Sequence, residues 1–121
     1  MNERRLDIMH ELGIVAQVIK IAQKTAEKNN LTKINKIILQ VGELSGAIPL
    51  YVKRGFPAVV YNTPMQDCEL EVEEVTAYGI CENCGHKFAI VKCEGECPKC
   101  QSNKFDIISG TQFLIKEIVA S

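Results

Sequence analysis

Two pairs of cysteines constrain the fold of this chain more than any other feature of its sequence. The pairs are Cys81-Glu82-Asn83-Cys84 and Cys97-Pro98-Lys99-Cys100, with twelve residues between them. A gap of two residues lets both thiolates of a pair face one ion at about 2.3 Å, and the second pair completes a tetrahedron. Four sulfurs leave no position for water or substrate, so the spacing predicts a structural zinc site. An iron site of the same shape and a redox dithiol are the alternatives.

Two other residues, both between these pairs, are weaker candidates for metal ligands. Cys93 lies between the pairs, but its neighbours do not form a two-residue knuckle. His86 could replace a cysteine, but four better-spaced thiolates already fill the coordination sphere, so we expect it to face solvent. Cys68 alternates with Leu70 and Val72, which predicts a small buried apolar side chain.

The segment 79–104, which carries the cysteine pairs, has few large apolar residues. Burial of its own surface would not offset the conformational entropy lost on ordering it. We therefore expect the metal ion to contribute the folding energy of this segment.

Hydrophobic periodicity outside this segment predicts two helices and three strands. Apolar residues at helical spacing, among them Ile8, Leu12, Val15 and Ile19, predict a helix from Ile8 to about Asn29. Pro49 suits the first turn of a second helix through Val60, which Pro57 should kink or shorten. A high content of β-branched residues, or the alternation of apolar and polar residues, predicts strands over 33–41, 68–75 and 112–119.

These elements predict an α+β fold in which a small three-stranded sheet with two helices carries an inserted zinc-ribbon-like module. The expected domains are an α/β domain over 1–78 and 105–121, and a zinc-binding domain over 79–104. Residues 1–8 read as an N-terminal extension.

Composition and the absence of several motifs limit the classes of function that we expect of this chain. The formal net charge of −1 gives no field that would hold nucleic acid or anionic lipid. The sequence has no apolar run of about 18 residues and no secretory signal, so we expect a cytoplasmic protein whose thiols stay reduced. It has no phosphate-binding glycine loop, HExxH motif or Ser/His/Asp set, so we expect no enzyme activity.

A second candidate site is Met9-His10-Glu11, at the start of the first predicted helix. Taken alone, this is a weak signal, because most His-Glu pairs at a helix start are solvated. Glu11 would also complement the positive end of the helix dipole there.

Six stretches, in this order, resemble the HypA/HybF family of nickel-incorporation proteins for hydrogenase maturation. They are MHELGIVAQVIKIA, KIILQVGELSGAIP, CELEVEEV, CENCG, CPKC and ISGTQFLIKEI, within residues 9–119. The resemblance implies a nickel metallochaperone that delivers Ni(II) to the large subunit of [NiFe]-hydrogenase. It implies a HypB-type GTPase as a partner, with urease maturation proteins and a second copy of the chain (a homodimer) as further candidates.

The resemblance also assigns ligands. His10 would bind nickel, with Met9 and Glu11 contributing through main-chain nitrogens. Zinc would be structural and held by Cys81, Cys84, Cys97 and Cys100. A terminal amine, two amides and an imidazole provide four nitrogens in one plane, which suits Ni(II).

The chain departs from the family pattern at its start. Met9 corresponds to the first residue of the family, so residues 2–8 follow Met1 as an extension. The nitrogen of Met9 is then an amide, which is a poorer donor than an amine. We expect translation in the cell to start at Met9. The alternative is a weaker site of the His10 imidazole and the Glu11 carboxylate, completed by a partner.

Two other classes of function share the paired cysteines. A nucleic-acid-binding zinc ribbon is disfavoured because residues 79–104 hold four lysines against three glutamates, with little aromatic surface for stacking. A zinc-ribbon adaptor without nickel function is the interpretation that follows if His10 has no role.

Overall fold

The computed structural model describes residues 3–121, with side chains from residue 10 onward. The chain forms two compact units. The first unit comprises Met1–Gln40, Ile48–Glu73 and Leu114–Ser121, and the second comprises Val41–Ala47 and Glu74–Phe113. The second unit therefore contains 79–104 together with flanking residues on both sides and a separate piece of chain from 41 to 47.

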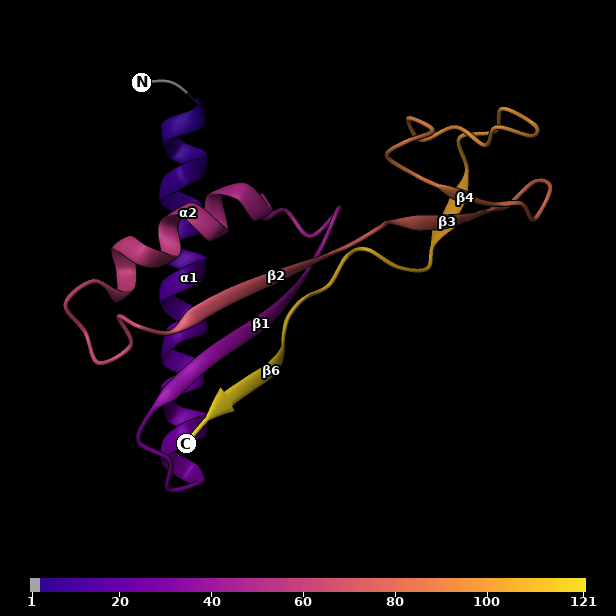
Figure 1. Ribbon diagram of the computed structural model, residues 1–121. Helices are drawn as coiled ribbons and strands as arrows, with labels where there is room; N and C mark the ends of the chain where they lie inside the picture. Colours follow the sequence, from indigo (N-terminus) through magenta and orange to yellow (C-terminus); the bar gives the residue numbers. More distant parts are fainter. Residues whose placement is uncertain (1–2) are drawn as a thin grey trace. The chain divides into compact units, whose positions relative to one another are not determined.

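Helix α1 (Glu3–Lys28) begins before the predicted start at Ile8 (Figure 1). Its buried stripe repeats at intervals of three and four residues, as the helical period requires. The members of this stripe are Glu11, Val15, Val18, Ala22 and Ala26. Ile19, which we expected in the core, is only half-buried, and the side chain of Ile8 lies outside the described residues. Among the described residues, no helix is long and apolar enough to span a membrane.

Helix α2 (Pro49–Val60) packs against α1. Pro49 occupies the first turn, where a missing N–H costs nothing, and the helix continues past Pro57 to Val60. A Cβ at Gly55 would lie 2.9 Å from Leu12 Cδ2, so a glycine here lets the two helices approach closely.

The first sheet has three strands in the order β2-β1-β6. They are β1 (Ile34–Gly42), β2 (Glu69–Val75) and β6 (Phe113–Ala120), as the alternation predicted. Ser121 N donates to Lys33 O, and Gly42 N donates to Gln112 O, so β6 runs antiparallel to β1. Alternate residues of β1, among them Ile37 and Leu39, are buried, as expected for a strand with one covered face.

The second unit contains a smaller antiparallel sheet in the order β4-β3-β5. Its strands are β3 (Tyr78–Cys81), β4 (Lys87–Ala89) and β5 (Phe105–Ile107). The rings of Phe88 and Phe105 meet edge to face with centroids 5.5 Å apart. The fold class is therefore confirmed: α+β, with two helices, a three-stranded sheet and a zinc-ribbon-like module.

The backbones of residues 42 and 110 approach closely inside the second unit. A Cβ built on Gly42 would lie 2.2 Å from Gly110 O, and one on Gly110 would lie 2.4 Å from Ala77 Cα. Leu44 N donates to Gly110 O at 2.7 Å, so this contact holds the 41–47 segment in place. Only glycine fits at either position.

We expect Gly42→Ala to lower the free energy of unfolding by about 3 kcal/mol, because rigid backbone atoms must move to admit the methyl group. Gly13 is the matched control: it is exposed inside α1, and a Cβ there meets no atom within 4 Å. Gly13→Ala should instead stabilise the protein by about 1 kcal/mol, through helix propensity. Urea unfolding followed by circular dichroism measures both changes, and an unchanged stability of Gly42→Ala would contradict the close approach.

Candidate metal centres

Four cysteine sulfurs of the second unit converge on one point. The ligand atoms of Cys81, Cys84, Cys97 and Cys100 all lie within 4.8 Å of one another. Cys81 Sγ lies 3.5 Å from Cys100 Sγ, and Cys84 Sγ lies 3.6 Å from Cys97 Sγ. A tetrahedron with metal–sulfur bonds of about 2.3 Å has edges of about 3.8 Å, so this cluster has the dimensions of a four-thiolate metal site.

The two cysteine pairs adopt the same backbone turn. In the first, Gly85 N donates to Cys81 O at 2.9 Å, and in the second, Gln101 N donates to Cys97 O at 2.8 Å. The residue after each pair has a positive φ, +74° at Gly85 and +64° at Gln101. The first knuckle thus uses glycine for the left-handed conformation, whereas the second holds a residue with a side chain in it.

The sulfurs of the cluster differ in their electrostatic environment. Hydrogen bonds from the Asn83 side chain and the Ser102 backbone lower the pKa of the Cys100 thiol to about 6. A backbone hydrogen bond from His86 lowers the pKa of Cys84, but desolvation and the neighbouring thiols outweigh it and raise that pKa to about 11. A metal ion must displace the protons that remain, so metal binding should weaken as the pH falls.

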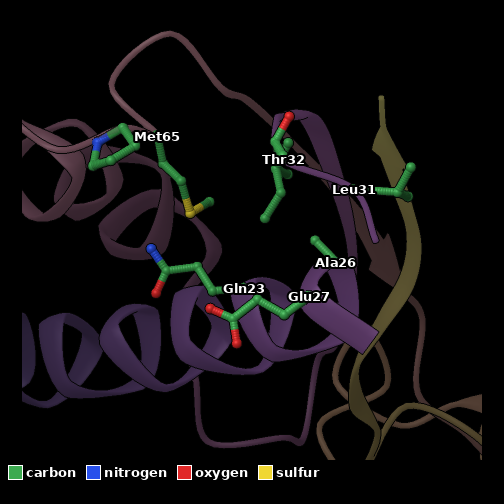
Figure 2. A pocket seen from close by; sticks show the side chains of 8 residues that line it. Gln23, Ala26, Glu27, Leu31, Thr32 and Met65 are labelled. Carbon is green, nitrogen blue, oxygen red and sulfur yellow. The ribbon is translucent and has the colours of Figure 1, made fainter. Parts of the chain in front are cut away.

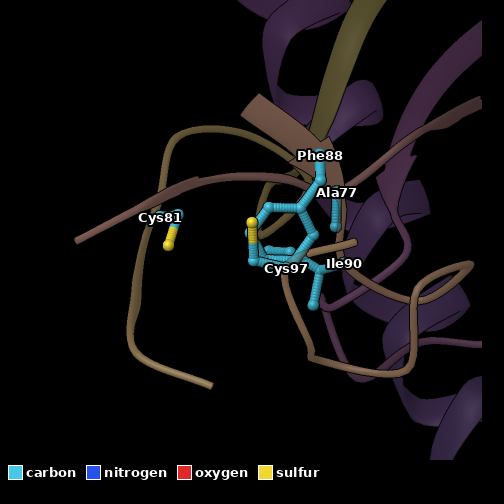
Figure 3. Close-up of a cluster of buried hydrophobic side chains, with 5 residues drawn as sticks. All are labelled: Ala77, Cys81, Phe88, Ile90 and Cys97. Atoms are coloured by element: carbon cyan, nitrogen blue, oxygen red, sulfur yellow. The ribbon is translucent and has the colours of Figure 1, made fainter. Parts of the chain in front are cut away.

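The sulfurs also differ in burial. Cys81 and Cys97 are 2% and 0% exposed and form part of the apolar core of the unit with Phe88 and Ile90 (Figure 3). Cys84 is exposed, and Cys100 is half-buried. The first cysteine of each pair therefore serves as core as well as candidate ligand.

The remaining candidates lie apart from this cluster. Cys93 packs against the apolar core as a partly buried side chain and is not among the converging sulfurs. His86 has an exposed side chain, and its backbone O accepts from Cys81 N. Cys68 is buried, as its alternation predicted, and burial followed by the charge of Glu69 raises the pKa of its thiol.

His10 projects from the first turns of α1 with an exposed side chain. Because α1 begins at Glu3, the main-chain nitrogens of Met9, His10 and Glu11 lie inside a helix. Their N–H groups are then directed at carbonyls four residues earlier and not at a ligand. Among the side chains of this segment that the structure describes, the exposed metal donor is the His10 imidazole.

Glu11 points about 100° away from His10 around the helix and is 1% exposed. Its Oε2 accepts a hydrogen bond from Ile48 N at 3.3 Å. Ile48 is the N-cap residue of α2, and its side chain makes no capping hydrogen bond. The Glu11 carboxylate from α1 therefore accepts a hydrogen bond at the N-terminus of α2 in its place. The spacing in the sequence is consistent with this burial, since Glu11 precedes Val15 by one helical turn on the buried stripe.

A separate pocket of about 200 Å³ lies at the other end of α1 (Figure 2). Among its lining side chains are Gln23, Glu27, Thr32 and Met65. One carboxylate without histidine or cysteine provides too few donors for a divalent ion, so this pocket is not a metal centre.

The geometry of the knuckles predicts that Gly85→Ala weakens Zn²⁺ binding about fivefold, because a left-handed backbone costs an alanine about 1 kcal/mol. A Cβ at Gly85 meets no atom within 4 Å, so the penalty is conformational and not steric. Gln101→Ala is the matched control and should change the affinity by less than about twofold, since Gln101 already carries a Cβ there. Competition with a chromophoric chelator measures both, and equal effects of the two substitutions would refute this reading of the knuckles.

The chain resembles proteins of one family along nearly its whole length. The model of the family described as "Hydrogenase/urease nickel incorporation, metallochaperone, hypA" matches residues 9–120. The chain is 36% identical over 110 residues to the hydrogenase maturation factor HypA of Chlorobaculum parvum, which covers 91% of this chain and 97% of that protein. It is 33% identical over 111 residues to the HypA of Francisella philomiragia, covering 92% and 98%.

Two solved structures share the fold. The solution structure of the Ni metallochaperone HypA from Helicobacter pylori superposes with a TM-score of 0.62 at 22% identity, covering 91% of this chain and 96% of that one. A second solution structure of a HypA protein gives a TM-score of 0.65 at 23% identity, covering 93% and 97%.

Proposed function

We propose that this chain, which belongs to the HypA family of hydrogenase/urease nickel-incorporation metallochaperones, binds Ni(II) and delivers it to the large subunit of [NiFe]-hydrogenase. One observation carries the proposal. The family match begins at Met9, directly before a histidine whose side chain is exposed on α1. Exposure suits a site whose ion must be passed on.

The proposed nickel donors are the His10 imidazole and the main-chain nitrogens of Met9, His10 and Glu11. Four nitrogens in one plane match the geometry that Ni(II) prefers. The helix that begins at Glu3 keeps these amides directed along its axis. We therefore propose that the nickel-binding form starts at Met9, where a terminal amine is available and the first N–H groups of a helix are unpaired.

The alternative donor, the Glu11 carboxylate, is less suitable. It is 1% exposed and bonded to Ile48 N, so binding an ion beside His10 would require its removal from the contact between α1 and α2. Such removal would leave the N-terminus of α2 without this acceptor, at a cost of about 1 kcal/mol or more.

We propose zinc as the ion of the four-cysteine cluster, with a structural role. Sulfur–sulfur distances of 3.5 and 3.6 Å fit its bond length, and four thiolates leave no open position for catalysis. Soft thiolates retain zinc while nitrogen donors take nickel, so ligand chemistry keeps the two metals apart.

The proposed partners follow from the family. A HypB-type GTPase and the hydrogenase large-subunit precursor are the first candidates, and urease maturation proteins and a second copy of the chain are the others. We place the protein in the cytoplasm, acting by binding and transfer and not by catalysis.

His10→Ala should weaken Ni(II) binding at least about 100-fold, since loss of a ligand costs more than loss of an outer-shell partner. Zinc content and the circular dichroism spectrum should stay unchanged. His86→Ala is the matched control because His86 is the only other histidine of the chain and its side chain is exposed. Isothermal titration with Ni(II) measures all three proteins. Equal affinities of the wild type and His10→Ala would leave a zinc-ribbon adaptor as the better account.

A chain that begins at Met9 should bind Ni(II) about 100-fold more tightly than one that begins at Met1, because only the shorter chain has an amine at Met9. Titrations of both chains and intact-mass analysis of the native protein test this expectation. Glu11→Gln in the shorter chain keeps an oxygen acceptor for Ile48 N and the main-chain donor, so its nickel affinity should be unchanged. A large loss in Glu11→Gln would instead identify the carboxylate as a ligand.

A further inference from the structure

The four sulfurs of the cluster are not equally open to reagents. Cys81 and Cys97 are covered by the apolar core of the second unit, at 2% and 0% exposure. Cys84 is exposed and Cys100 is half-buried. Any molecule that reacts with the folded cluster must therefore approach the second cysteine of one of the pairs.

Neighbouring groups shield one of these two sulfurs more than the other. Cys100 lies beside Asn83 and Ser102. Both residues line a polar pocket of about 450 Å³ beside the knuckles, with Asn103 among the other lining residues. Cys84 is therefore the sulfur of the cluster that a reagent in solution reaches most readily.

We propose that Cys84 is a modification site, at which electrophiles and peroxides attack the zinc-loaded cluster, and that its oxidation releases the ion. The inference rests on the proposed zinc occupancy. It concerns the chemical reactivity of the bound sulfurs, which a structural role for zinc leaves open. Oxidant exposure would then unfold the second unit, since the ion contributes its folding energy.

The oxidation balances with a peroxide as the oxidant. The Cys84 thiolate attacks one peroxide oxygen, so that an S–O bond forms, the O–O bond breaks and hydroxide leaves. Cys97 Sγ, 3.6 Å away, then attacks the Cys84 sulfur, so that an S–S bond forms and a second hydroxide leaves. Two electrons pass from the two thiolates to the peroxide, and the ion loses two of its four ligands.

Labelling of the full chain with N-ethylmaleimide tests the order of attack. The zinc content is measured first. The zinc-loaded protein is then treated with a substoichiometric amount of the reagent and the reaction is quenched. Peptide mass mapping identifies the modified cysteines. The sulfur adds to the maleimide double bond, which takes up a proton from water. Among the four cluster cysteines, adducts on Cys84 should exceed those on Cys81 or Cys97 at least about tenfold. Cys93 lies outside the cluster and is counted separately.

Released zinc, followed with a colorimetric chelator, should match the number of Cys84 adducts. Treatment with hydrogen peroxide should give a Cys84–Cys97 disulfide in the peptide map. Equal labelling of all four sulfurs would overturn the inference, because it would mean that the cluster opens as a whole before it reacts. A chain that binds no zinc before treatment would instead overturn the proposed zinc occupancy and this inference with it.

Two asparagines of the same pocket provide a matched pair of variants. Asn83→Ala removes the polar side chain beside Cys100, so it should raise the labelling of that sulfur about threefold. Asn103→Ala changes the same pocket and should leave the labelling pattern unaltered. Unchanged labelling of Cys100 in Asn83→Ala would contradict the shielding argument.

Discussion

The convergence of four sulfur atoms is the interaction on which the second unit depends. Its sheet consists of strands of three or four residues, and its fully buried residues are few. Two of those residues, Cys81 and Cys97, are themselves members of the cluster. A core this small cannot offset the entropy of ordering the nearly fifty residues of this unit, so metal coordination and apolar burial must act through the same side chains. This explains why the first cysteine of each knuckle is buried whereas the second faces outward.

Much of this architecture follows from local sequence patterns. The alternation in 68–75, the apolar pattern in 112–119 and the β-branched run in 33–41 identified the three strands of the first sheet, with every end within one residue of the observed one. The paired spacing identified the four sulfurs that converge, and it also separated them from Cys93 and Cys68. Both signals are local, since a strand or a knuckle is determined by residues within a few positions of one another.

Features that depend on contacts between distant segments were not evident in the sequence. The segment 41–47 belongs to the second unit because residues 42 and 110 approach closely through two glycines, and no periodicity encodes such a contact. The left-handed conformation of Gln101 is another case, since a glutamine there gives no hint of a positive φ. The early start of α1 at Glu3 differs in kind: residues 3–7 lie before the apolar periodicity that predicted the helix, and extending a formed helix costs far less than starting one.

His10 and Glu11 are adjacent on α1 but lie in different environments. Successive residues of a helix point about 100° apart, so a side chain directly after an exposed one can reach the buried face. His10 is therefore open to solvent, whereas Glu11 lies under α2 and accepts a hydrogen bond from Ile48 N. An acidic residue beside a histidine suggests a shared metal site when only the sequence is considered. The helix instead directs the carboxylate to the positive end of α2, where its charge is stabilised. Glu11 thus links α1 to the N-terminus of α2 at the residue next to His10. In the proposed nickel site, its side chain holds the segment in place, and only its main-chain nitrogen is a donor to the ion.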